Sequence, residues 1–196
     1  MISELHLPLI LLAAFVASAS PGPATLAIAG TSMNAGRGHG LALAAGVLTG
    51  SLLWSVAAAF GLGAIMLANV WAFEVVRYAG AGYLLYLAYK SARAALSRQP
   101  MVQSRLTVTS YRAAYRRGLA LHLTNPKAIL FFGSLFSVGV PVDAAASSMA
   151  IIIAAVGLQS ALVFHGYALI FSSAPMIAGY TRLRRWFEGV FAVVFA

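Results

Sequence analysis

Residues 20 to 25 read Ser20-Pro21-Gly22-Pro23-Ala24-Thr25, and they interrupt an apolar run long enough to cross a membrane as a helix. A later apolar run is interrupted in the same way by Asn125-Pro126-Lys127. Proline inside a helix removes a backbone donor and clashes with the preceding turn, which costs about 3 kcal/mol or more. Hydrocarbon offers no water to replace the lost hydrogen bond. We therefore expect two broken helices, and breaks of this kind line solute sites in membrane proteins.

The composition is that of an integral membrane protein. Hydrophobic residues make up 61% of the chain and charged residues 9%, whereas soluble domains average about 45–50% and 25%. The 196 residues contain no linker or low-complexity tract, so we expect one transmembrane domain that covers residues 1–196. Cysteine is absent, which rules out disulfides, thiolate metal sites and CxxC redox chemistry. We expect no metal and no cofactor.

Apolar stretches of about 20 residues predict six transmembrane helices and hence an all-α fold. The last stretch is short, because a helix from Trp186 to Ala196 reaches only about 16 Å, half of a bilayer core. We therefore expect the last helix to be truncated. Ala17-Ser18-Ala19 resembles a signal-peptide cleavage site, but no Lys or Arg precedes the first run, so we expect that run to be retained. The predicted helices lie near residues 7–33, 41–68, 74–95, 114–137, 146–172 and 184–196.

The basic residues set the predicted orientation. Loop 96–113 and its flanks are basic and contain no acidic residue, which makes this loop cytoplasmic by the positive-inside rule. Because each span reverses sides, we expect a multi-pass protein of the cytoplasmic (inner) membrane with both termini outside. Every Lys and Arg except Arg77 and Lys127 then lies inside. The net charge of +9 is thus explained by topology and attraction to anionic lipid, with no nucleic acid as partner. A regulatory role of the basic loop is the alternative.

Three predicted helices on each side of this loop suggest an internal duplication. Pro21 and Pro126 are 105 positions apart, and the same shift carries the second predicted helix onto the fifth. Halves with an odd number of spans run in opposite directions across the membrane. We therefore expect a 3+3 inverted repeat with halves at about residues 1–95 and 114–196.

Four motifs occur in order along the chain: Ser20-Pro21-Gly22-Pro23, the Gly36-Arg37-Gly38-His39-Gly40 turn before an Ala/Gly-rich helix, the stretch from Tyr78 to Tyr86 (YAGAGYLLY), and Asn125-Pro126-Lys127-Ala128 followed by Phe131-Phe132. Together, from about residue 8 to residue 172, they resemble the lysine exporter and homoserine/threonine resistance (LysE/RhtB) family of amino-acid export proteins. The resemblance implies six helices, export of amino acids or similar small metabolites, and coupling to the proton-motive force. Many members carry Asp or another polar residue where this chain has Ala24, so no acidic contact is implied there.

Backbone chemistry predicts how the breaks bind a solute. The half-helices that start after Pro23 and near Ala128 point free N–H groups and positive dipole ends toward mid-membrane, which suits a carboxylate. The carbonyls of residues 17–20 and 121–124 lose their usual donors and suit an ammonium group. The alternative for each break is a kink repaired by neighbouring helices and by Ser or Thr side chains. The predicted substrate-binding residues are Ser20, Pro21, Gly22, Pro23, Thr25, Asn125, Pro126 and Lys127; Ser18 and Thr124 lie beside them.

Charged and titratable side chains are scarce in the predicted spans. A charged Lys127 near the bilayer centre has a high free-energy cost. We therefore expect its ammonium group to face a substrate carboxylate or, alternatively, to anchor the opposing break by bonding to the backbone carbonyls there. No Asp or Glu occupies the central part of a span. His165 and His122 are therefore the candidate proton carriers, because histidine titrates near neutral pH, and packing roles are the alternative for both.

These observations predict a six-helix secondary transporter that exports amino acids or related small metabolites by alternating access around a mid-membrane site. A membrane scaffold or a passive channel is the competing interpretation. We do not expect an enzyme, since the sequence shows no metal-ligand cluster, nucleophile and base pair, or Gly-rich phosphate loop. The expected partners are an amino-acid substrate, membrane lipid and a second copy of the chain in a homodimer.

Overall fold

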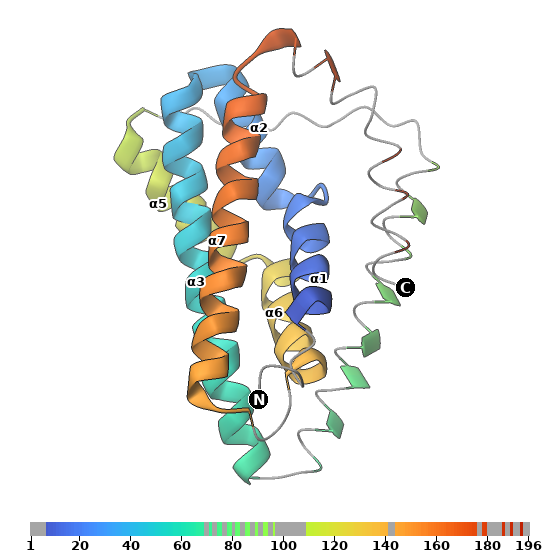
Figure 1. The fold of residues 1–196 in the computed structure, drawn as a ribbon. Coiled ribbons are helices and arrows are strands. Elements are labelled where there is room, and N and C mark those ends of the chain that lie inside the picture. The colour runs from blue at the N-terminus through green and yellow to red at the C-terminus, as the bar shows by residue number, and fades with distance from the viewer. Residues whose placement is uncertain are drawn as a thin grey trace.

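The structure is a computed structural model that describes residues 7–68, 109–140 and 144–175, with scattered residues between 71 and 96 and between 178 and 193. Every regular element in this part of the chain is a helix, which confirms the all-α prediction (Figure 1). The predicted helices 74–95 and 184–196, most of loop 96–113 and the expected C-terminal truncation lie largely outside the described residues. The main helices are α1 (Leu7–Ala19), α2 (Pro23–Ala35), α3 (Arg37–Ala68), α5 (Tyr111–Leu123), α6 (Pro126–Gly139) and α7 (Ala146–Ile170).

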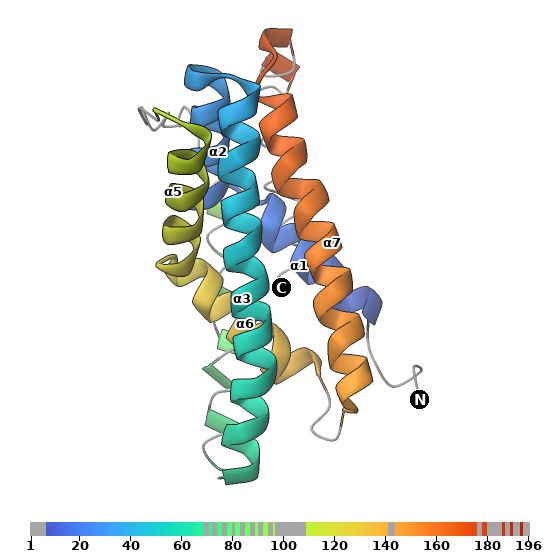
Figure 2. The same cartoon turned by 90° about the vertical axis from the view of Figure 1, so that its left-hand side faces the viewer.

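Two long helices form the centre of the molecule. Helices α3 and α7 lie side by side in both views (Figures 1 and 2) and pack on each other. Residues Arg37–Gly61 of α3 and the whole of α7 are long and apolar enough to cross a membrane. The pair α1 and α2 also meets this test as one span, which is bent by 50° at the break. Up to three membrane spans are thus supported within the described residues.

The turn before α3 is shorter than the sequence predicts. We expect a glycine-rich turn at residues 34–40, but helix continues to Ala35 and starts again at Arg37. The reason is Gly36, which has a φ of 84° and reverses the chain in a single residue. Gly40 stays free of a side chain because a Cβ there would lie 1.9 Å from Ser32 Oγ on α2.

Helix α5 begins at Tyr111 rather than at residue 114, so the predicted end of loop 96–113 is wrong by a few residues. The cause is an N-cap, because Ser110 Oγ accepts a hydrogen bond of 3.2 Å from the backbone N–H of Ala113. Arg112 lies in the first turn after this cap. Because the helices are predicted from apolar stretches, a charged residue at this position is assigned to the loop.

The short helices divide the molecule into two levels. Helices α1 and α6 lie together beside the lower part of α3 and α7, and α2 and α5 lie beside the upper part (Figures 1 and 2). Each level has its own hydrophobic core. The lower cluster contains Ile10, Ala14, Val16, Ala17, Ala59, Phe131, Phe132, Leu135, Phe136, Val140, Ile152 and Val156. The upper cluster contains Ala24, Ala27, Ile28, Leu43, Ala44, Val47, Ala114, Phe164 and Ala168.

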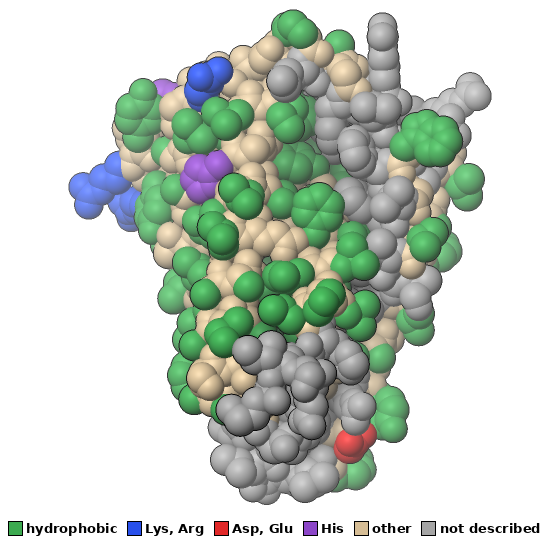
Figure 3. Space-filling view, viewed as in Figure 1, with side chains coloured by type: hydrophobic (Ala, Val, Ile, Leu, Met, Phe, Trp, Pro, Cys, Tyr) green, Lys and Arg blue, Asp and Glu red, His purple; other side chains and the backbone are tan. Residues whose placement is uncertain are grey.

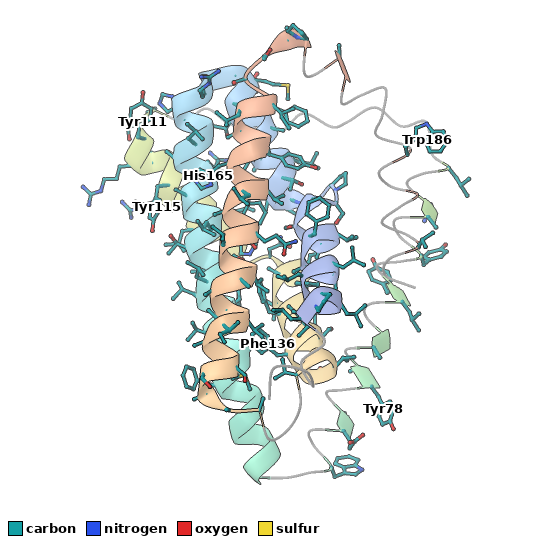
Figure 4. All side chains as sticks on the ribbon, viewed as in Figure 1. Tyr78, Tyr111, Tyr115, Phe136, His165 and Trp186 are labelled. Atoms are coloured by element: carbon teal, nitrogen blue, oxygen red, sulfur yellow. The ribbon has the colours of Figure 1, made fainter. Side chains whose placement is uncertain are left out.

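Helix α3 packs closely on α5 through a glycine of each helix. A Cβ at Gly46 would lie 2.0 Å from the carbonyl oxygen of Tyr115, and a Cβ at Gly118 would lie 2.2 Å from that of Leu43. Only glycine fits at either position, as in other small-residue contacts between membrane helices. The Tyr115 hydroxyl, beside α3 in Figure 4, donates a 3.0 Å hydrogen bond to Thr49. The upper level is therefore tightly interlocked.

The outer surface fits a membrane environment. Among the described residues on the face shown in Figure 3, most of the coloured side chains are hydrophobic, and the Lys and Arg side chains gather at the end where α2 meets α3 and where α5 begins. Large apolar side chains on both long helices are exposed, among them Phe60 at 74% and Leu162 at 69%. A water-soluble protein would bury most of these side chains.

Candidate functional site

The first break, between α1 and α2, is held by Thr25. Its hydroxyl accepts a 2.9 Å hydrogen bond from the Gly22 N–H and lies 3.1 Å from the Gly22 carbonyl, to which it donates. Pro23 occupies the first helical position, where a missing N–H costs nothing. The N–H groups of Ala24 and Thr25, in the first turn of α2, have no acceptor within their own helix. These two amides remain available to an anion.

The second break, between α5 and α6, has its own local cap. Asn125 Oδ1 accepts a 3.0 Å hydrogen bond from the Lys127 N–H at the start of α6. The Thr124 hydroxyl donates to the Ala120 carbonyl at 2.9 Å and thereby closes the end of α5. At both breaks, side chains of the same segment therefore bond to the backbone next to the proline.

Lys127 joins the two breaks. Its Nζ lies 3.3 Å from the carbonyl oxygen of Ser20, and it also contacts the Ser20 hydroxyl. The stem of Lys127 passes over Gly22, where an added Cβ would lie 3.4 Å from both Cδ and Nζ. The contact predicted by the anchoring interpretation of Lys127 is therefore present, and it ties the end of α1 to the start of α6.

A cavity opens where the two breaks meet, between the lower and upper clusters. Its empty space is about 490 Å³ when the open mouth and the solvent there are included. Lys127 is the one charged side chain among the described residues that line it, and no carboxylate lines it. The lining residues are Ala14, Ala17, Ser18, Ser20, Gly22, Ala24, Thr25, Ser51, His122, Asn125, Lys127, Ala128, Phe131, Phe132, Val156, Ser160 and Phe164.

The structure brings most of the sequence-predicted site residues to this cavity. Residues from both breaks line it, and so does one of the two histidines. Pro21, Pro23 and Pro126 are not among the lining residues; they shape the backbone around it. The predicted residues that line the cavity are Ser20, Gly22, Thr25, Asn125, Lys127 and His122.

His165 lies away from the cavity. Val156, Ser160 and Phe164 of α7 line it at intervals of four residues, and His165 is turned by about 100° from this face. Its Nδ1 lies 2.8 Å from the Ala161 carbonyl of the same helix. Figure 4 shows it on the upper part of α7. A proton carried by His165 would not pass directly to the cavity.

The backbone carbonyls that we expected to receive an ammonium group are mostly occupied, which corrects this prediction. Ala17 accepts from the Ser20 hydroxyl at 3.2 Å, and Ala19 accepts from the Tyr167 hydroxyl at 2.5 Å. The Ser20 carbonyl accepts from Lys127. In the second group, the Leu121 carbonyl accepts from the Thr124 hydroxyl at 3.4 Å and the His122 carbonyl accepts from the Asn125 N–H at 3.2 Å. Pattern reading missed this because Tyr167 and Lys127 arrive from distant parts of the chain.

Three lining side chains have unpaired polar groups. His122 is 5% exposed, and both of its ring nitrogens are buried without a hydrogen bond. Ser51 and Ser160 are 3% and 4% exposed, and the structure shows no hydrogen bond from either hydroxyl to the described residues. Sequence reasoning missed both serines. The available signal was their position inside apolar runs, with Ser160 directly after Gln159.

Comparison with known proteins agrees with this architecture. Residues 15–196 match the family described as LysE type translocator. The chain belongs to the LysE family. It is 30% identical over 183 residues to the threonine efflux protein of Salmonella typhi, covering 92% of this chain and 89% of that protein. It is 35% identical over 154 residues to the leucine efflux protein of Salmonella choleraesuis, covering 79% of this chain and 72% of that protein. No solved structure matches the chain.

Family membership settles the class of the protein. LysE members and the efflux relatives are transporters, so the predicted family and the prediction of a transporter rather than an enzyme are confirmed. The apolar helices and the family together support a multi-pass protein of the inner membrane.

Proposed function

We propose that this LysE family member exports amino acids or related small metabolites, and that they bind in the cavity between the two helix breaks. The observation that carries this proposal is the meeting of both breaks at one cavity, with Lys127 of the second break bonded to Ser20 of the first. Breaks that lie far apart along the chain share a wall of one pocket, as the helix breaks of a transport site do. Similarity to threonine and leucine efflux proteins adds independent support.

The carboxylate of the substrate binds at the start of α2. The free amides of Ala24 and Thr25 and the positive end of the helix favour an anion there, and both residues line the cavity. Lys127, whose Nζ lies beside Gly22 at the start of α2, supplies the cationic partner. Its contacts with Ser20 position the ammonium in the empty site, and a carboxylate competes with them.

An inverted repeat explains how access alternates. The 105-residue shift places α1 on α5, α2 on α6 and α3 on α7 to within four residues at each start. The helix contacts also come in matching pairs: α3 with α5 and α7 with α1, α3 with α6 and α7 with α2, α2 with α5 and α6 with α1. The contact of α2 with α3 has no counterpart of similar extent between α6 and α7 in the described residues. The two halves of the repeat rock against each other about the breaks.

Export is coupled to the proton gradient, and His122 is the better placed of the two candidate carriers. It lines the cavity, whereas His165 does not. Lys127 is the other titratable side chain among the described lining residues. Replacing each histidine separately by glutamine and measuring transport with and without a pH gradient tests this assignment. Stimulation by the gradient that survives in both variants would remove both residues as carriers.

Transport itself is tested with the purified chain in liposomes. Labelled threonine and leucine are the first probes, and saturable exchange of one of them is the expected result. A flux that rises linearly with concentration would show a passive channel instead. If no amino acid exchanges at all while the protein is folded and inserted, the proposed function is wrong.

A further inference from the structure

The start of α2 and Lys127 can bind the carboxylate of an amino acid in this cavity. The backbone carbonyls that were expected to bind its ammonium group already accept other hydrogen bonds. An ammonium group brings three N–H donors, and most of the carbonyls that the sequence assigned to it already accept hydrogen bonds within the protein. Another set of acceptors is therefore needed, and no carboxylate lines the cavity.

We infer that His122, Ser51 and Ser160 form an ammonium subsite in this cavity. This inference rests on the proposed function, since it names the second half of the same site. The three side chains come from α5, α3 and α7, and all three line the cavity. They offer one neutral ring nitrogen and two hydroxyl oxygens, which matches the three donors of an ammonium group.

The burial of these groups gives the subsite its energetic basis. Both nitrogens of His122 are buried without partners, while its ring edge packs on Phe164 with centroids 5.9 Å apart. A buried polar group without a hydrogen bond costs about 1–3 kcal/mol. An ammonium N–H that donates to the acceptor nitrogen of His122 removes this penalty for that nitrogen.

The position of His122 is fixed by packing rather than by hydrogen bonds. Gly50 of α3 lies directly against it, because a Cβ at Gly50 would lie 2.9 Å from His122 Cβ. Gly50 directly precedes Ser51, so the imidazole lies against the turn of α3 that carries Ser51. The aromatic wall of Phe131, Phe132 and Phe164 then remains for the substrate side chain.

The test pairs variants with substrate analogues in liposomes. Unlabelled threonine competes with labelled threonine, as do threoninamide, which lacks the carboxylate, and 2,3-dihydroxybutanoate, which carries a hydroxyl in place of the ammonium. Leucine with its corresponding analogues is used if it is the better substrate. Wild-type protein is expected to prefer threonine over the hydroxy acid by about tenfold or more, because hydrogen bonds to charged groups are strong.

His122→Leu is expected to remove about tenfold of the preference over the hydroxy acid and to keep the preference over the amide. Lys127→Met is expected to lose the preference for threonine over threoninamide and to keep the preference over the hydroxy acid. The double variant Ser51→Ala/Ser160→Ala is expected to act like His122→Leu, and it tests the subsite if His122→Leu does not fold. Ser137→Ala serves as its control, since Ser137 is a buried serine outside the cavity lining.

The inference is overturned if wild-type protein transports threonine or leucine but the His122 and serine variants discriminate against the hydroxy acid as strongly as wild-type. That result would leave the proposed function intact. Absence of transport in wild-type protein would instead refute the proposed function, so the two failures are distinguishable.

Discussion

At the residue scale, the hydroxyl of Thr25 stabilises the backbone of the first break, between α1 and α2. The Thr25 hydroxyl accepts a hydrogen bond from the Gly22 N–H and donates one to the Gly22 carbonyl. Thr25→Val keeps the shape of the side chain but loses both hydrogen bonds, so we expect the free energy of unfolding to fall by about 1 kcal/mol. Thermal melting in detergent measures this change. Thr25→Ser keeps the hydroxyl and is expected to melt near wild-type; equal melting of Thr25→Val and wild-type would show that this cap is dispensable.

Lys127 connects the local chemistry of both breaks. We expect Lys127→Met to raise the half-saturation concentration for threonine about tenfold, because a charge-assisted contact with the carboxylate is lost. Concentration-dependent exchange in liposomes measures it. If Lys127 acts only as an anchor for Ser20, the melting temperature falls and the half-saturation concentration stays at the wild-type value.

At the scale of elements, glycine contacts lock α3 onto α5. Gly46 and Gly118 each face a backbone carbonyl of the other helix at a distance that admits no methyl group. We expect Gly46→Ala or Gly118→Ala to push the helices apart and to destabilise the protein by about 1–3 kcal/mol. The matched control is Gly166→Ala in α7, where an added Cβ meets nothing within 4 Å. Higher helix propensity should leave that variant equally or more stable, and equal melting of all three variants would contradict the packing account.

The break between α1 and α2 is also an element-scale feature. Pro21→Ala together with Pro23→Ala restores two backbone donors, so we expect α1 and α2 to join into a longer helix. Joining them displaces Ser20 and Gly22 from the cavity, and transport should be lost. Liposome exchange measures transport, and the amount of protein extracted from membranes shows that insertion is normal. Wild-type transport by this variant would mean that the first break is not part of the site.

At the scale of the whole molecule, charge distribution sets the orientation in the membrane. The absence of native cysteine allows single cysteines to be labelled without background. We expect a cysteine at Ser3 to react with an impermeant maleimide from outside intact cells, and one at Ser104 to react only in inside-out vesicles, because the basic loop stays in the cytoplasm. The opposite pattern would reverse the proposed orientation.

The sequence prediction and the structure agree best on helix ends that are set by neighbouring residues. The turn chemistry of Pro21-Gly22-Pro23 and Asn125-Pro126 was sufficient to predict where helices α1 and α5 end, because proline acts on its own turn. The single-residue turn at Gly36 and the cap at Ser110 shifted two boundaries by a few residues. Both are short-range effects whose exact position depends on dihedral angles that composition does not give.

The amino-acid sequence by itself determined the membrane class, the all-helical fold and the family, since apolar length and short motifs are properties of contiguous residues. Only the tertiary structure decided which polar groups share a cavity. It joined Lys127 to Ser20, turned His165 away, and placed His122 with Ser51 and Ser160. These residues lie on helices far apart in the chain, and the rotation of each helix about its axis is fixed by packing between helices rather than by local sequence.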